Sequence, residues 1–359
     1  MKAPRHRHCL PLLGLVCLAV LSSSVRAQAP SIRIGESVPR DVREIYDRGL
    51  QFLATSQDAS GGWKGGGYEG PGITGMGLLV FLASGEDPNF GMYSQNVRRA
   101  LRNMISSQNE VTGFFDAGRG GGHSSMYEHG FAMLALAEAF GAVDDRDLWA
   151  GTDNRKGRLI GPSLELAVRS AVTSQKKNSF GGWRYGPDAT DADTSVSGSV
   201  LVGLLAARNA GIEVPDEAID RAITYYTKMT SPSGQVGYSG GFGGFDESIA
   251  RISIATLVYA VARRKDLPEY KATLGYLTER LETSDAGHYL EYTRYYQAQA
   301  LFQGDVEAWE KWNRLLLRQL KTAQAADGSF PSQFGTTVGT SLSLLSLALN
   351  YRFLPIYER

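Results

Sequence analysis

The sequence is poor in the residues that build metal centres and covalent cross-links. Its 359 residues include two cysteines and five histidines. Both cysteines, Cys9 and Cys17, lie close to the N-terminus. Downstream of them no disulfide, thiolate metal site or cysteine nucleophile is available. Only His123, His129 and His288 remain as histidines beyond that region.

An excess of charge of one sign is also missing. The 37 Lys and Arg residues balance the 37 Asp and Glu residues. Four of the basic residues lie within residues 1–27, so residues 28–359 carry 33 basic against 37 acidic side chains. This balance provides no basic surface for nucleic acid or for an anionic membrane. We therefore expect no nucleic-acid partner. We also expect no integral membrane span, because the apolar run at residues 10–21 is too short for one.

The N-terminus has the pattern of a signal peptide. Lys2, Arg5 and Arg7 precede an apolar run at residues 10–21, and Val25-Arg26-Ala27 offers small residues for cleavage. The apolar run is too short to cross a bilayer comfortably. We predict cleavage after Ala27 and a periplasmic or extracellular location. Residues 28–40 are predicted to be a lead-in and residues 41–359 a single domain.

The remaining chain repeats one unit, in which an amphipathic helix, a Gly-rich turn and an apolar helix follow one another. Gln57 and Gln108 end two such first helices 51 residues apart, and Gln175 to Gln324 spans 149 residues, or three further steps. A period of this length indicates a helical repeat protein. Residues 144–161 are predicted to be a surface insertion. The six predicted hairpins are 41–57 with 73–83, 93–108 with 127–140, 163–175 with 194–211, 215–229 with 248–263, 268–282 with 288–303, and 306–324 with 339–351.

The order of helices within each hairpin predicts how the six units assemble. An apolar helix needs burial on both flanks, and an open stack would leave one exposed at each end unless polar caps covered it. Neither the first nor the sixth unit has the polar character of a cap. The predicted fold is therefore an all-α (α/α)6 toroid, a double ring with the apolar helices inside.

The turns resemble those of the terpene cyclase and protein prenyltransferase superfamily. The matching turns are Gln57 with Gly61-Gly62-Trp63, Gln175 with Gly181-Gly182-Trp183 and, more weakly, Gln108 with Gly113-Phe114 and Gln324 with Gly328-Ser329-Phe330. This resemblance to prenyltransferase and squalene oxidase repeats covers roughly residues 41–351. It implies the same toroid, but the fold hosts several functions.

Within that superfamily the chain looks most like squalene–hopene-type cyclases, whose acid motif reads D-x-D-D-T. The corresponding residues are Asp191-Ala192-Asp193-Thr194, in which Thr194 replaces the last aspartate. The resemblance implies Asp193 as a proton donor and Asp191 as its partner. The missing Cys argues against the zinc chemistry of the prenyltransferases. No metal or other cofactor is expected.

Asp191 and Asp193 admit two interpretations. A neighbouring carboxylate together with burial can keep a carboxylic acid protonated, as acid catalysis requires. Short polar residues are also the usual helix N-caps, and position alone favours capping for Asp193 or Thr194. The additional aspartates at 188 and 191 are more than a cap needs.

A second candidate group lies at the start of the second apolar helix. Glu128 and His129 are predicted catalytic residues there, and His123 precedes them. The spacing of the two histidines lacks the helical i, i+4 pattern of a metal pair. A structural, hydrogen-bonded histidine is the alternative.

Closure of the ring places the starts of all apolar helices on one rim, where polar and aromatic side chains then gather around a central apolar cavity. The predicted ligand-binding residues on this rim are Tyr127, Trp183, Tyr185, Phe245, Asp246, Glu291 and Tyr292.

Three functions remain open. The first is binding or acid-initiated conversion of an isoprenoid or other apolar small molecule. The second is a non-catalytic ligand- or partner-binding toroid, and the third is a secreted polysaccharide lyase or hydrolase on the same ring.

Overall fold

A computed structural model of the chain describes residue 1 and residues 38–65, 68–115, 125–154, 157–240, 247–282 and 289–357. Residues 38–359 form one compact unit. Apart from residue 1, the predicted signal peptide lies outside the described residues, as does most of the predicted lead-in. Within the described part, no helix has both the length and the apolar character needed to cross a membrane.

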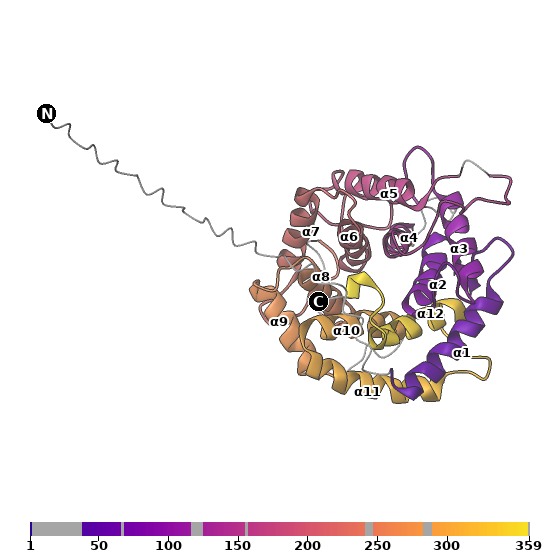
Figure 1. Ribbon diagram of the computed structural model, residues 1–359. Helices are drawn as coiled ribbons and strands as arrows, with labels where there is room; N and C mark the ends of the chain where they lie inside the picture. Colours follow the sequence, from indigo (N-terminus) through magenta and orange to yellow (C-terminus); the bar gives the residue numbers. More distant parts are fainter. Residues whose placement is uncertain are drawn as a thin grey trace. The chain divides into compact units, whose positions relative to one another are not determined.

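The described part of this unit contains twelve α-helices in two concentric rings (Figure 1). The outer helices are α1 (Arg40–Ser56), α3 (Ser94–Ser107), α5 (Ile160–Gln175), α7 (Asp216–Met229), α9 (Pro268–Thr278) and α11 (Val306–Ala323). The inner helices are α2 (Pro71–Ala83), α4 (Ser125–Ala139), α6 (Thr194–Asn209), α8 (Ile249–Val261), α10 (Leu290–Gly304) and α12 (Thr336–Leu347). The predicted all-α (α/α)6 toroid is confirmed.

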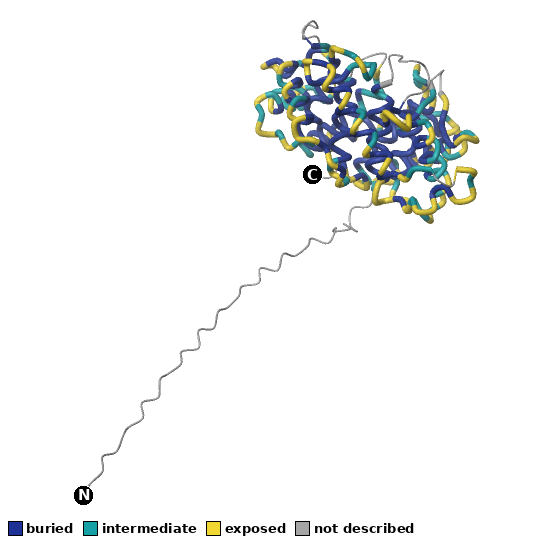
Figure 2. The backbone as a smooth tube through the Cα atoms, turned by 90° about the horizontal axis from the view of Figure 1, so that it is seen from above, coloured by how far each residue is buried: buried dark blue, intermediate teal, exposed yellow. Residues whose placement is uncertain are grey.

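Sequence pattern explains which helices lie inside. The outer helix α1 buries one face, including Val42, Tyr46 and Leu53, and exposes the other. The inner helix α2 is buried along its whole length except at Met76. Figure 2 shows this division, with buried residues gathered in the interior of the unit and exposed residues on its outside. The predicted start of α2 at residue 73 is two residues late, because Pro71 occupies the first helical turn, where its fixed φ is favourable.

A glutamine at the end of an outer helix joins each of four hairpins to the next. The Gln175 side-chain amide donates to the carbonyl oxygens of Gly181 in its own turn, at 2.6 Å, and Ala218 in α7, at 2.8 Å. Gln57 and Gln108 make equivalent pairs of bonds. Each buried amide therefore satisfies carbonyl oxygens in two consecutive hairpins.

The last hairpin makes the same contacts with the first, and this closes the ring. Gln324 donates to the carbonyl oxygens of Gly328 and of Ile45 in α1, each at 2.9 Å. The Arg48 guanidinium donates to the Ala325 carbonyl at 2.7 Å. Gly328 has a φ of +90°, and a Cβ there would stand 2.3 Å from the Arg48 carbonyl oxygen, so only glycine fits.

The minor elements lie at the two rims. A two-residue hairpin, β1 (Lys64–Gly65) paired with β2 (Tyr68–Glu69), precedes α2. Two 3₁₀ turns, η1 (Ala348–Asn350) and η2 (Pro355–Tyr357), follow α12. Ile356 in η2 is buried, and its N–H donates to Glu138 near the C-terminal end of α4. The C-terminal segment thus packs over the rim where the inner helices end.

Candidate functional site

The inner helices begin on a common rim, as predicted. The first residues of α4 and α6 are tied to the turns that follow them: the Met126 N–H donates to the Tyr185 carbonyl and the Thr194 N–H to the Tyr238 carbonyl. Around the ring, the Thr337 hydroxyl at the start of α12 donates to the Lys64 carbonyl. These bonds place the heads of the helices side by side.

Asp193 stands at the head of α6 and is fully buried. Its Oδ1 accepts the N–H groups of Ser195 at 2.7 Å and Val196 at 2.9 Å, so it is the N-cap of the helix. Capping is therefore established as one role of Asp193. Its Oδ2 is also buried and takes no part in the cap, and the Tyr238 hydroxyl lies close enough to the carboxyl to oppose the rise of its pKa. A cap uses only one of the two oxygens.

Burial raises the pKa of the Asp193 carboxyl above its ordinary value, against the opposing effects of the N–H groups, the Tyr238 hydroxyl and Arg184. The direction follows because a buried carboxylate loses its hydration. The same burial raises the pKa values of Tyr127 and Tyr292 well above the usual one, so both stay neutral phenols.

Asp191, the second predicted aspartate, lies nearer the surface. Its Oδ2 is 3.5 Å from Nη1 of Arg184, and the two side chains are 54% and 23% exposed. The Arg184 guanidinium also lies over the rings of Tyr185, at 4.9 Å, and Tyr238, at 5.4 Å. Asp191 is thus held as a paired, accessible carboxylate, while Asp193 is buried.

Tyrosines surround the Asp193 carboxyl on the rim. The hydroxyl oxygens of Tyr185 and Tyr238 are 2.7 Å apart. The Tyr127 ring lies 6.5 Å from that of Tyr185 and 6.2 Å from that of Tyr292. Three predicted ligand-binding residues, Tyr127, Tyr185 and Tyr292, are therefore brought together.

Aromatic side chains, including those of Tyr127 and Tyr292, fill part of the central axis of the toroid. Helices α4 and α10 stand opposite each other in the inner ring (Figure 1). Tyr127 of α4 meets Tyr292 of α10, and one turn deeper the rings of Phe131 and Tyr295 are 5.9 Å apart. At these two levels aromatic side chains occupy the axis where the sequence predicts an apolar cavity, because side chains from opposite helices are long enough to meet.

His129 has a different environment from the one expected of a catalytic base. Its Nδ1 accepts the Phe115 N–H at 3.2 Å, and its Nε2 lies 3.0 Å from the Ala167 carbonyl oxygen in α5. Burial lowers its pKa to about 4, so the ring is neutral near pH 7. Ser197 and Thr340 stand at the equivalent positions of two other hairpins. Their hydroxyl oxygens accept the N–H groups of Trp183 and Phe330, as His129 Nδ1 accepts that of Phe115. This equivalence favours the structural role for His129.

Of the other predicted residues, Trp183 contacts Asp193 directly, because its carbonyl oxygen accepts the Asp193 N–H at 2.9 Å. Glu128 Oε2 accepts the Gly72 N–H at 3.2 Å and so stabilises the start of α2. Trp183 is fully buried, and its indole donates to the Ala171 carbonyl in α5. Glu291 is half-buried near Arg294. Phe245, Asp246 and the histidines at 123 and 288 lie outside the described residues.

One residue that the sequence analysis missed is Tyr238. It follows Gly234 by four residues, as Tyr185 follows Gly181, and both glycines have positive φ. The turn from Gly234 to Tyr238 lacks the Gly-Gly-Trp sequence, so the equivalence of Tyr238 and Tyr185 was not apparent from the sequence. Across the described ranges, no group of three His, Cys, Asp or Glu side chains is arranged to hold a metal ion.

The comparisons with known proteins agree with the fold. No family profile and no curated protein matches the sequence. An inactive variant of the α-1,6-mannanase GH76A of Salegentibacter sp. is 10% identical with a TM-score of 0.58, and the match covers 86% of this chain and 99% of that one. A mannosidase of glycoside hydrolase family 76 from Bacteroides thetaiotaomicron is 11% identical, with a TM-score of 0.58 over 86% and 98% of the two chains.

A variant of the type II terpene cyclase MstE from Scytonema, solved with geranylgeranyl dihydroxybenzoate, is 13% identical. Its TM-score is 0.55 over 88% of this chain and 98% of that one. These identities are too low to carry over an activity. What they establish is an α/α toroid, a fold shared by terpene cyclases and mannanases.

Proposed function

We propose that the rim at the head of α6 is an acid site, where Asp193 protonates an apolar, electron-rich ligand of the isoprenoid class. The observation that carries this proposal is the second oxygen of Asp193. A buried carboxyl with a raised pKa and an oxygen outside the cap is suited to hold a proton and to deliver it to a ligand.

The proposed step moves one proton. The O–H bond at Oδ2 breaks, a C–H bond forms at a carbon–carbon double bond of the ligand, and a carbocation and a carboxylate result. The N–H groups of Ser195 and Val196 already point at Oδ1 and stabilise the carboxylate. The faces of nearby tyrosine rings stabilise a cation. Transfer of a proton from the cation back to the Asp193 carboxylate gives an isomer of the ligand and restores the acid, so the reaction needs no co-reactant.

The sequence match supports the assignment in two positions and departs from it in one. Asp191 and Asp193 match the first two aspartates of the D-x-D-D-T motif, and Asp191 is held beside Arg184. Thr194, in place of the last aspartate, donates its hydroxyl to the Gly237 carbonyl at 2.9 Å. It therefore fastens the fourth turn to the head of α6 and contributes no carboxyl.

Action on a glycan is a second candidate, and the filled ring axis favours it. A ligand that cannot descend past the Tyr127 and Tyr292 rings lies shallowly on the rim, beside the exposed Asp191. The comparison mannanase loses activity when two adjacent aspartates are replaced. The one adjacent aspartate pair in this sequence, Asp144 and Asp145, lies in the surface insertion that follows α4, with Asp144 paired to Arg146. This placement argues for the isoprenoid reading.

The test is turnover of linear isoprenoids by the purified protein. We expect squalene, geranylgeraniol or geranylgeranyl dihydroxybenzoate to yield cyclic isomers of unchanged mass, detected by mass spectrometry. Asp193→Asn keeps the capping oxygen and removes the acid, and should lower the rate by about 100-fold or more. The control is Asp188→Asn, since Asp188 lies on the same loop and is paired with Lys177 at the surface.

Two results would contradict the proposal. One is an Asp193→Asn protein that converts the ligand as fast as the unaltered protein. The other is consumption of α-1,6-mannotriose with none of the isoprenoids converted, which would establish the glycan candidate instead.

We also propose that the chain is exported and cleaved after Ala27. The basic start and the apolar run at residues 10–21 support this. Intact-mass measurement of protein recovered from its native host should show a chain beginning at Gln28. Retention of residues 1–27 would rule the cleavage out.

A further inference from the structure

The last described residues, 352–357, lie across the far mouth of the ring, which is the end at which the inner helices end. We call this segment the strap. The Phe353 ring lies against Gly85, just after α2, where an added Cβ would stand 2.2 Å from that ring. The Arg352 guanidinium lies 5.5 Å from the centre of the Phe302 ring in α10, and η2 packs against α6. The strap thus contacts inner helices on several sides of the ring, and Figure 1 shows it, in yellow, over the inner ring.

Two aliphatic side chains of the strap are directed into the protein. Leu354 and Ile356 are each 2% exposed, whereas their neighbours Phe353 and Pro355 are exposed. The Ile356 N–H donates to Glu138 Oε2 in α4 at 3.4 Å. The strap therefore covers the mouth with one side and presents the other side to solvent.

Glu138 is an unfavourable residue for its place in α4. It lies in the last turn of the helix, where the helix dipole disfavours a negative charge. It is also buried, and a buried carboxylate loses its hydration. Helix stability therefore does not explain a carboxylate at this position, whereas its hydrogen bond to the strap does.

Helix periodicity places Glu138 at the far end of the ring axis. It follows Tyr127 by eleven residues, close to three complete turns, so both lie on the face of α4 that meets α10. Gln303 follows Tyr292 in α10 by the same eleven residues and is also buried. Polar side chains thus lie on the axis beneath the strap, whereas aromatic rings occupy it toward the other end.

The strap is separate from the contacts that close the ring. Gln324 and Arg48 join the last hairpin to the first before the chain reaches the strap. Arg352 has a φ of +59°, a left-handed conformation that is uncommon outside glycine, and here the chain leaves the end of the last hairpin and crosses toward α4. A short segment held by two buried side chains and a long hydrogen bond opens at a lower cost in free energy than the helices beneath it.

We propose that the strap is a lid over a second entrance to the ring, with Glu138 as its latch. Leu354 and Ile356 fill the mouth while the lid is closed. When the lid opens, Glu138 and Gln303 become accessible from the side opposite Asp193. Opening of the lid controls access to the ring and does not depend on the function proposed for Asp193.

Cysteine labelling tests the lid, because Cys9 and Cys17 are the only cysteines of the sequence and both can be replaced by serine. Gln303→Cys then introduces one thiol beneath the strap, and mass spectrometry follows its reaction with N-ethylmaleimide. We expect slow labelling in the full chain. Truncation after Tyr351 and Ile356→Asp should each accelerate it by about tenfold or more, since buried aliphatic side chains hold the strap in place.

Two matched controls accompany these variants. Pro355→Asp introduces the same charge at an exposed position of the strap and should leave the labelling rate unchanged. For the latch, Glu138→Leu removes the acceptor of the Ile356 N–H and should accelerate labelling by about fivefold. Glu138→Gln retains an acceptor and should label at nearly the rate of the unaltered protein. Equal rates for Glu138→Leu and the unaltered protein would exclude the latch.

A second reporter separates opening of the lid from unfolding. Leu101 in α3 is fully buried, so a thiol introduced by Leu101→Cys reacts only when the ring itself opens. Its labelling rate should not change on truncation. Equal labelling of Gln303→Cys with and without the strap would overturn the proposal, because the mouth would then be uncovered in solution. Equal acceleration of Leu101→Cys, or a truncated chain that fails to fold, would overturn it as well, because the strap would then be an integral part of the ring.

Discussion

The third and fourth turns of the ring deliver matching tyrosines to Asp193 by different means. Tyr185 and Tyr238 each stand four residues after a positive-φ glycine, and their hydroxyls meet at 2.7 Å. The third turn is held by Gln175, by the Trp183 indole and by Arg221. The fourth has Val236, fully buried, in the place of the tryptophan.

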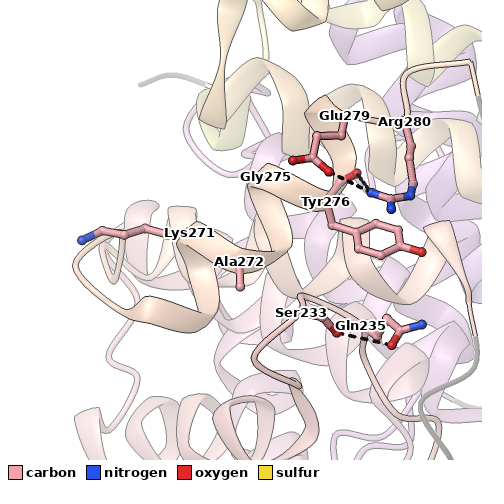
Figure 3. Close-up of a pocket in the computed structure, with 8 residues that line it drawn as sticks. All are labelled: Ser233, Gln235, Lys271, Ala272, Gly275, Tyr276, Glu279 and Arg280. Carbon is pink, nitrogen blue, oxygen red and sulfur yellow. Dashed lines mark hydrogen bonds and ion pairs between the residues drawn. The ribbon is translucent and has the colours of Figure 1, made fainter.

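The glutamine is replaced as well. Thr230 ends α7 where Gln175 ends α5, and its hydroxyl donates to the Tyr226 carbonyl at 2.8 Å, within its own hairpin. The element that both turns keep is the glycine packed on a carbonyl of the next outer helix. The difference between the two turns indicates that this glycine determines the conformation of the turn. Glutamine, tryptophan and arginine stabilise the turn further through their hydrogen bonds. Beside the fourth turn, where Ala272 stands in the place of Arg221, the surface groove has a volume of about 580 Å³ (Figure 3), against about 340 Å³ beside the third turn.

Alanine at the packed glycines should have the largest effect. In Gly234→Ala the new Cβ would lie 2.3 Å from the Ala272 carbonyl oxygen, on a residue with a φ of +87°. We expect a loss of about 3 kcal/mol in the free energy of unfolding, measured by urea denaturation. Gly181→Ala should act similarly, because its Cβ would lie 2.7 Å from the Arg221 carbonyl oxygen.

Gly211→Ala is the control for backbone strain alone. Its φ is +91°, but within the described part of the chain no atom lies within 4 Å of an added Cβ, so a loss of about 1 kcal/mol is expected. Equal losses at Gly211 and Gly234 would show that packing on the next helix is unimportant to the turn.

Removing the glutamine should have the next largest effect, and only in the third turn. Gln175→Ala deletes two hydrogen bonds to buried carbonyl oxygens, and we expect a loss of about 2 kcal/mol in unfolding free energy. Thr230→Ala in the fourth turn should lose about 1 kcal/mol, since its bond stays within one hairpin. If Gln175→Ala and Thr230→Ala unfold at the same urea concentration and with the same dependence on urea, the glutamine does not reinforce the third turn more than the threonine reinforces the fourth.

The periodicity of the sequence was sufficient to predict the helices and the closure of the ring. Glycines, glutamines and apolar runs determine the turns and helices in which they themselves lie, so their positions in the sequence can be interpreted directly. Asp193 was also predictable as a helix cap and as an acid candidate. The partners of His129 were not, since Phe115 and Ala167 reach it only through tertiary packing. The contact of Phe131 with Tyr295 across the axis has no local signal either.

The pH dependence of stability should distinguish Asp193 from an ordinary cap. A raised pKa in the folded state means that the folded protein holds this proton after the unfolded chain has lost it. The stabilising contribution is therefore complete below about pH 4, the ordinary carboxyl value, and is lost as the pH rises through the raised pKa.

Asp193→Asn should remove this decline, because an amide does not titrate. Thermal denaturation of both proteins from pH 3 to pH 8 measures how their difference in stability depends on pH. The contributions of other titrating groups, such as His129, are the same in both proteins and cancel in this difference. An ordinary cap has a lowered pKa and would give the opposite slope, with stability lost as the pH falls. That result would end the acid assignment.

The smallest effect, and the only gain, is expected at Gly275 in α9, in the groove beside the fourth turn. Gly275→Ala adds a methyl group at a position where no atom of the described residues lies within 4 Å, and removal of a helix-interior glycine should raise the unfolding free energy by up to about 1 kcal/mol. Gly304→Ala is the matched control, since its Cβ would lie 2.4 Å from the Leu274 side chain, and it should be destabilising. A loss of stability in Gly275→Ala would mean that the groove is filled in solution. A gain would mean that α9 keeps a less stable residue next to the position where Ala272 replaces the arginine of the third hairpin, as expected where selection has not maximised stability.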